Sequence, residues 1–228
     1  MNRLHFITAT LIGLLAFTQI GLAEPTSERV AELKANLQAS KAILRHYQWI
    51  ETTVVSVNGD EKSSKQQLCS YADDGSIQRT ELDQTQSGGG GFLFHRLRER
   101  KKEEMTEYMK SAVALIKTYV PPSPSMIQAC KDAGNFSLTI LDPGKRARIT
   151  FTNYEQQGDS YSIDISLVSN RPLRLHVSTY LNDPSQPVTL TVNMREMDNG
   201  ASYPSQSILN ADAKGLIVTI TNSDYQRN

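Results

Sequence analysis

Hydrophobic and polar residues alternate along most of the chain after Phe136. The alternating apolar positions are Ala147, Ile149 and Phe151; Tyr161, Ile163, Ile165 and Leu167; Leu173, Leu175 and Val177; and Val188, Leu190, Val192 and Met194. A period of two gives each strand one apolar and one polar face. Turn-forming residues at Gln157–Asp159, Asn182–Pro184 and Asp198–Gly200 make neighbouring strands antiparallel. A last strand is predicted over Leu216–Thr221.

The chain before Phe136 mixes helical and extended segments. A helix is predicted over Ser27–His46, because its leucines recur at helical spacing and Ser27 can cap it. Strands are predicted over Tyr47–Val57, Gln66–Tyr71 and Ser76–Leu82.

A glycine-rich break at Ser87–Gly91 introduces the middle of the chain. A long charged helix follows and ends at Tyr119, because the prolines that come next cannot continue it. A shorter helix over Ser125–Ala133 ends at Gly134.

A sheet with one apolar face must be covered, by helices or by a second sheet. Helices are favoured, so the predicted fold class is α+β: a curled antiparallel sheet (half-barrel) with its concave face covered by the N-terminal helix and the mid-chain helical insertion. Trp49 is expected to face the covered side with Tyr47, Thr53 and Val55, although Glu51 then shares that face. A one-residue slip would instead place Ile50, Thr52 and Val54 inside.

The first residues have the pattern of an export signal. Arg3 precedes an apolar run from Phe6 to Ile20, and Gly21-Leu22-Ala23 supplies the small residues that a signal peptidase recognises. An uncleaved membrane anchor is the alternative. We expect cleavage after Ala23, no lipid attachment because residue 24 is Glu rather than Cys, and a single domain over residues 24–228 that is periplasmic or secreted.

The 24 basic and 24 acidic residues balance, so no global field attracts nucleic acid, and no nucleic-acid partner is expected. In an exported protein the two cysteines, Cys69 and Cys130, can form a disulfide. Two separate buried thiols are the alternative.

Residues with catalytic or metal-binding chemistry are scattered. His46, His95 and His176 show no metal-ligand spacing, and the chain has no Gly-x-Ser-x-Gly motif. The run Gly88–Gly91 has no phosphate-loop Lys-Ser/Thr after it. We therefore expect no metal, no cofactor and no enzymatic activity; a hydrolase without a familiar motif is the alternative.

The order of an export signal, a helix, a short meander, a helical insertion and a long meander resembles the LolA/LolB-like half-barrel of periplasmic lipoprotein carriers. Segments Lys102–Lys110 and Thr221–Tyr225 also look like those of uncharacterised secreted bacterial proteins. The resemblance implies an apolar cavity that accepts acyl chains. It would also imply a basic residue at the cavity mouth, which no motif here assigns.

The segment Phe92–Lys102 joins aromatic residues to a cluster of cations. Its apolar residues either plug the hollow of the sheet or belong to a mobile lid that contacts a membrane surface. The candidate ligand-binding residues are Trp49, Phe92, Phe94, Leu97, Met105 and Met109. The candidate membrane-surface residues are Arg96, Arg98, Arg100, Lys101 and Lys102.

The sequence thus predicts an exported binder or carrier of a hydrophobic or lipid-like ligand in the cell envelope. The alternative is a structural or interaction protein whose hollow is filled by its own side chains. The partners expected are an apolar ligand and a transient membrane contact.

Overall fold

The computed structural model describes residues 25–86 and 95–228. Its helices are α1 (Pro25–Leu44), α2 (His95–Tyr119), α3 (Pro124–Asp132) and the short 3-10 helix η2 (Asp212–Lys214). Its strands are β1 (Tyr47–Val57), β2 (Asp60–Tyr71), β3 (Ile77–Gln86), β4 (Phe136–Asp142), β5 (Arg146–Thr152), β6 (Ser160–Ser166), β7 (Pro172–Tyr180), β8 (Pro187–Glu196), β9 (Ser202–Ala211) and β10 (Leu216–Arg227).

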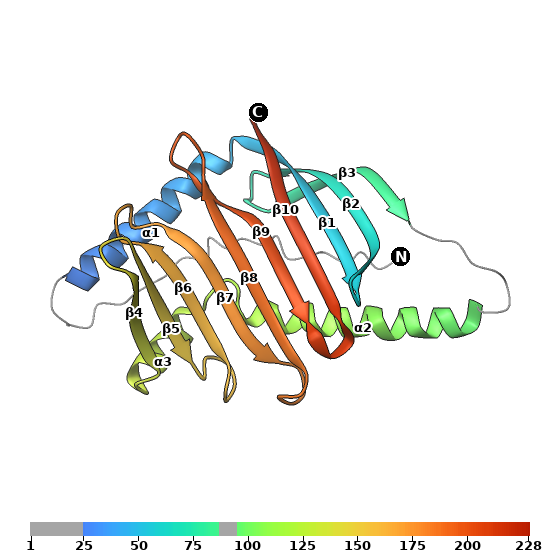
Figure 1. Ribbon diagram of the computed structural model, residues 1–228. Coiled ribbons are helices and arrows are strands. Elements are labelled where there is room, and N and C mark those ends of the chain that lie inside the picture. Colours follow the sequence, from blue (N-terminus) through green and yellow to red (C-terminus); the bar gives the residue numbers. More distant parts are fainter. Residues whose placement is uncertain (1–24, 87–94) are drawn as a thin grey trace.

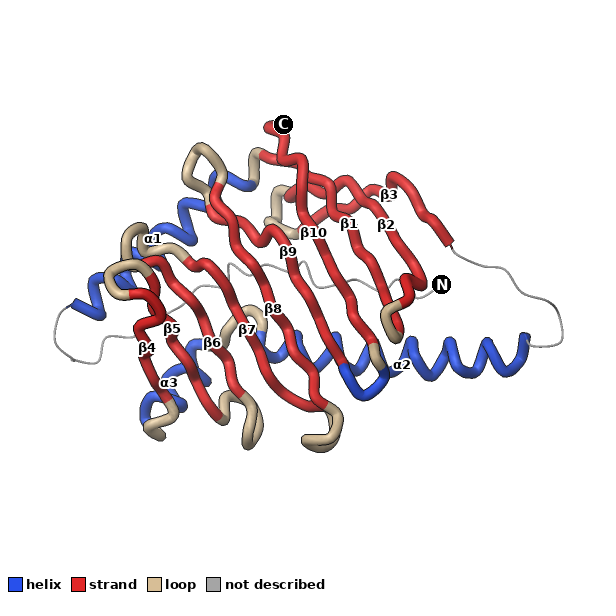
Figure 2. The backbone as a smooth tube through the Cα atoms, in the orientation of Figure 1, coloured by secondary structure: helices blue, strands red, loops and turns tan. Residues whose placement is uncertain are grey.

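The strands form one open, ten-stranded antiparallel sheet in the order β3-β2-β1-β10-β9-β8-β7-β6-β5-β4 (Figure 2). Consecutive strands pair with each other, except for β3 and β4, which form the two edges of the sheet. The two halves join where β1 pairs with the last strand, β10, with Val54 opposite Thr219. Figure 1 shows the sheet as a curved layer with α1 and α2 running across it. The predicted fold class, a curled open sheet combined with helices, is confirmed.

The strand bounds differ most from the prediction where side chains are polar. β2 begins at Asp60, and β10 continues to Arg227, beyond the apolar run that ends at Thr221. In both strands the extra length pairs with β1: Asp60 lies opposite Val57, and Arg227 lies opposite Tyr47. Backbone hydrogen bonds to β1 hold these segments in the sheet. Such bonds do not depend on side-chain type, so the hydrophobic pattern of the sequence does not reveal the extra length.

The core lies between the inner face of the sheet and the helices. Ala112, Ile116 and Tyr119 of α2 have no exposed surface. They belong to one apolar cluster with Leu33 of α1 and the inward side chains of β5 to β10. The helices therefore cover the sheet, as the sequence predicted.

The register expected for β1 is confirmed. Trp49, Glu51 and Thr53 are buried, with exposed fractions of 3%, 1% and 6%, whereas Ile50 and Val54 are only half-buried. Glu51 is accommodated on the inner face because Arg79 of β3 lies beside it, with its Nε 3.2 Å from Oε1 of Glu51.

The predicted disulfide is wrong: Cys69 on β2 and Cys130 on α3 are separate, buried thiols. Cys69 lies opposite Trp49 in the ladder of β1 and β2. The Cys130 thiol points to the Thr152 carbonyl oxygen on β5, with an S···O distance of 3.7 Å. Because the two residues pack against opposite ends of the sheet, the alternative of two buried thiols holds.

Candidate functional site

The side chains that α2 packs against the inner face of the sheet become less buried toward the N-terminus of the helix. In the C-terminal half of this helix Ala112, Ile116 and Tyr119 are fully buried, whereas Met105, Tyr108 and Met109, nearer its N-terminus, are half-buried against the same core. Val55 and Val57 of β1 are half-buried against that core too. We call these five residues the half-buried patch.

The patch lies where β1 and β10 meet. Val57 lies opposite Leu216, the first residue of β10. The pKa of Tyr108 is raised, first by burial and then by the negative charge of Asp212, which lies in η2 just before β10. These relations place α2 and the end of β1 at the same edge of the core.

A buried carboxylate anchors the other end of α2. Asp159, in the turn before β6, accepts hydrogen bonds from the Tyr119 hydroxyl at 2.5 Å and from the backbone N–H groups of Tyr154, Glu155 and Gln156. Burial and the hydrogen bond to Asp159 raise the pKa of Tyr119 well above its ordinary value. The three backbone donors fix the carboxylate within its turn, and the Tyr119 hydroxyl holds the end of α2 to that turn at the filled end of the core.

A second inner-face cluster lies at the far end of β1 and is aromatic and polar. The Trp49 ring stacks on that of Tyr225, with centroids 5.5 Å apart, and contacts that of Tyr71 at 5.3 Å. Tyr203 of β9 contacts Tyr225 in turn, at 4.5 Å. We call these four rings the Trp49 cluster; Trp49 is not part of the main apolar core.

Charged groups adjoin the Trp49 cluster on β1 to β3. Besides the Glu51–Arg79 pair, Lys65 and Glu81 form an ion pair at 2.5 Å. Burial, and secondarily the charge of Glu51, raise the pKa of the Cys69 thiol to about 12, against the opposing effect of Arg79. At neutral pH Cys69 is therefore a protonated thiol, unsuited to nucleophilic or metal chemistry.

The structure brings only part of the predicted ligand site together. Met105 and Met109 lie in the half-buried patch, but Trp49 lies eight residues from Val57 along β1, which is about 26 Å at the usual rise per residue. Phe92 and Phe94 are outside the described residues. Leu97, Arg96, Arg98, Arg100, Lys101 and Lys102 fall on the described backbone of α2, but their side chains are outside it.

Sequence reasoning missed Asp159 and the partners of Trp49. In the sequence, Asp159 is recognisable only as part of a turn, and no residue near it along the chain indicates that Tyr119 donates to it. Tyr225 lies beyond the predicted end of the last strand, in the part of β10 that pairs with the start of β1.

Within the described ranges, no group of three histidine, cysteine or carboxylate side chains is placed to hold a metal ion. No helix in that part of the chain is long and apolar enough to span a membrane.

No protein-family profile matches the sequence, and no curated protein does. Among solved structures, the chain is similar to a DUF1329 family protein from Desulfovibrio piger, with a TM-score of 0.42 and 11% identity over 90% of this chain and 94% of that one. It is also similar to a LolA superfamily protein from Nitrosomonas europaea, with a TM-score of 0.34 and 12% identity over 86% and 93% of the two chains. A third is a putative outer membrane lipoprotein-sorting protein domain from Vibrio parahaemolyticus, with a TM-score of 0.33 and 10% identity over 89% and 90%.

The second of these structures is from the superfamily that the order of elements resembles.

Proposed function

We propose that this protein is exported and binds a hydrophobic or lipid-like ligand at the half-buried patch. The observation that carries the proposal is the change along α2, where the fully buried Ala112, Ile116 and Tyr119 give way to the half-buried Met105, Tyr108 and Met109. Methionine side chains are flexible and polarizable and adapt to apolar groups of different shape. An acyl chain lying against Met105, Met109 and Val57 would remove apolar surface from water on both partners.

The second candidate is a structural or interaction protein without a ligand, and one observation favours it. Ala112, Ile116 and Tyr119 already fill the hollow opposite β5 to β10. Any ligand must therefore occupy the Met105 side of the core.

The deciding experiment measures saturable binding of a fluorescent fatty acid to the protein produced without residues 1–23. We expect binding by the wild type and its loss in Met109→Lys, because a lysine there places a charge in an apolar site. Ala114→Lys is the matched control, since it introduces the same side chain on an exposed position of the same helix.

Equal loss of binding in both variants, or no saturable binding by the wild type, would contradict the proposal and leave the self-filled half-barrel. Native mass spectrometry of the protein from its own host supplies an independent result, because a co-purified acyl chain identifies the ligand class.

The proposal includes a role for the segment before Met105. Phe92, Phe94 and Leu97 are proposed to contact the ligand, and the cations between Arg96 and Lys102 to meet anionic headgroups. The test is binding to vesicles with and without anionic lipid, which should fall when these cations are replaced by glutamine. Equal binding to both kinds of vesicle would contradict the headgroup role.

A further inference from the structure

The two edges of the sheet are protected to different degrees. β3 and β4 lie at opposite ends of the strand order (Figure 1). β3 carries Arg79 and Glu81, whose charges are paired with Glu51 of β1 and Lys65 of β2. Charged side chains of this kind disfavour the addition of a further strand to an edge.

β4 has no such protection. From Phe136 to Leu141 it contains no charged residue and no proline, and its large apolar side chains are exposed. Phe136, Leu138 and Ile140 have exposed fractions of 42%, 49% and 53%. They lie opposite Phe151, Ile149 and Ala147 of β5, and so they extend the core face of the sheet to its edge.

The backbone of β4 determines which groups face outward. The Thr152 N–H donates to the Asn135 carbonyl oxygen at 3.0 Å, next to the Phe136–Phe151 pair. This pattern makes Phe136 and Phe151 a non-hydrogen-bonded pair, so the N–H and C=O groups of Phe136, Leu138 and Ile140 point away from β5. In the part of the chain that the structure describes, no strand pairs with this outer side of β4.

We propose that β4 pairs antiparallel with β4 of a second copy of this chain, with Leu138 on the two-fold axis. In this register Leu138 lies opposite its counterpart and Phe136 lies opposite Ile140, so the outward-pointing backbone groups meet one another and the apolar side chains share one face. Ser137 lies opposite Thr139 on the other face, which is a favourable cross-strand pair. The strand is thus complementary to itself, as a two-fold interface requires.

The same register brings an acidic residue toward a basic one. Asp142 of one copy falls opposite Gly134 of the other, just beyond α3, and Lys131 of α3 is the basic residue at this end of β4. Its ammonium lies 5.8 Å from the centre of the Phe136 ring. A head-to-tail contact between β4 and β3 would instead place the apolar strand against the charges of β3.

The test compares the two edges by analytical ultracentrifugation of the protein without residues 1–23. We expect a concentration-dependent dimer, its loss in Leu138→Lys, and its retention in Leu82→Lys. Leu82 is the matched control, because it is exposed to a similar extent (51%) on the opposite edge strand.

A wild type that stays monomeric, a Leu138→Lys dimer, or loss of the dimer in Leu82→Lys would overturn the proposal. Circular dichroism establishes that each variant is folded. If Leu138→Lys does not fold, Leu138→Cys decides the question: it should form a disulfide-linked dimer under mild oxidation. The linked dimer should be absent in Leu82→Cys; no linked dimer in Leu138→Cys would equally overturn the proposal.

Discussion

Asp159 accepts hydrogen bonds both from its own turn and from the Tyr119 side chain of α2. Its carboxylate accepts four bonds in a site where it is only 2% exposed, and the Tyr119 hydroxyl also lies 2.8 Å from Oγ1 of Thr179. A buried carboxylate persists in such a site because its donors replace water. The turn before β6 and the end of α2 are therefore held by one side chain.

We predict that Asp159→Asn lowers the free energy of unfolding by about 3 kcal/mol, because an amide cannot accept all four bonds and leaves buried donors unpaired. Urea unfolding measures the change. Asp198→Asn, on an exposed turn, should change stability by about 0.5 kcal/mol or less. Equal effects at the two positions would show that Asp159 does not anchor α2.

Glu51 is a second buried carboxylate, and it forms an ion pair with Arg79. Glu51 is 1% exposed, and the Arg79 side chain is 20% exposed. We predict that Arg79→Ala destabilises the protein by about 3 kcal/mol, because it leaves a buried carboxylate without its cation.

Lys65→Ala breaks the more exposed pair with Glu81 on the same strands and should cost about 1 kcal/mol or less. Chemical denaturation of the two variants makes the comparison. A smaller loss for Arg79→Ala than for Lys65→Ala would contradict the interpretation of Glu51 as a residue that depends on its partner.

At the scale of elements, the junction of β1 and β10 carries the only tryptophan of the chain. Opposite Trp49, β10 contains one extra residue, since Gln48 pairs with Gln226 and Ile50 with Ser223. Asp224 in this bulge adopts a φ of 53°, and Tyr225 is thereby placed against the indole.

We predict a blue-shifted native tryptophan emission that acrylamide quenches weakly, because Trp49 is 3% exposed. Tyr225→Ala should shift the emission to longer wavelength and increase quenching. Tyr180→Ala, which removes a ring outside the Trp49 cluster, should not. Red, readily quenched emission in the native wild type would mean that Trp49 faces solvent.

At the scale of the whole molecule, the features that can be predicted from the sequence are those set within one short segment. The bounds of β1, the proline-limited end of α2 and the inner face of Trp49 follow from side-chain type and spacing within one segment. The pairing of β1 with β10 joins residues from the two ends of the described chain, and no local pattern specifies it. The same holds for the partners of Cys69 and Asp159, which only the assembled sheet brings near.

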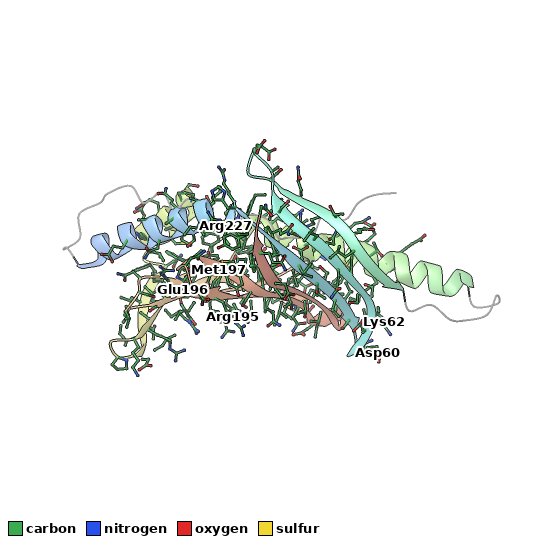
Figure 3. The ribbon with its side chains drawn as sticks, turned by 90° about the horizontal axis from the view of Figure 1, so that it is seen from above. Asp60, Lys62, Arg195, Glu196, Met197 and Arg227 are labelled. Atoms are coloured by element: carbon green, nitrogen blue, oxygen red, sulfur yellow. The ribbon has the colours of Figure 1, made fainter. Side chains whose placement is uncertain are left out.

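Figure 3 views the molecule from above and shows the curved sheet that the pairing of β1 with β10 completes. The start of β2 at Asp60 and Lys62 and the end of β10 at Arg227 lie far apart on the curved sheet. β10 connects the β1–β3 meander to the β4–β9 meander, so the inner face is continuous only through this strand. The half-buried patch and the Trp49 cluster both depend on that connection.

The continuous inner face also determines how stability responds to alkali. Burial raises the pKa of the Cys69 thiol from its ordinary value of 9.0 to about 12, and that of the Tyr154 phenol from 10.0 to about 12. It is also the largest cause of the raised pKa values of Tyr161 and Tyr225. Between about pH 9 and pH 12, the unfolded chain therefore releases protons that the native chain keeps.

Since the native state binds more protons in that range, the free energy of unfolding must fall as pH rises. We predict that the urea midpoint declines progressively from pH 9 upward, because the stabilisation is complete only below the ordinary pKa values. Absorbance titration of the phenolates should show that these buried tyrosines ionise only as the protein unfolds. If they titrate near pH 10 in a chain that remains folded, these tyrosines are open to water and are not packed in the core.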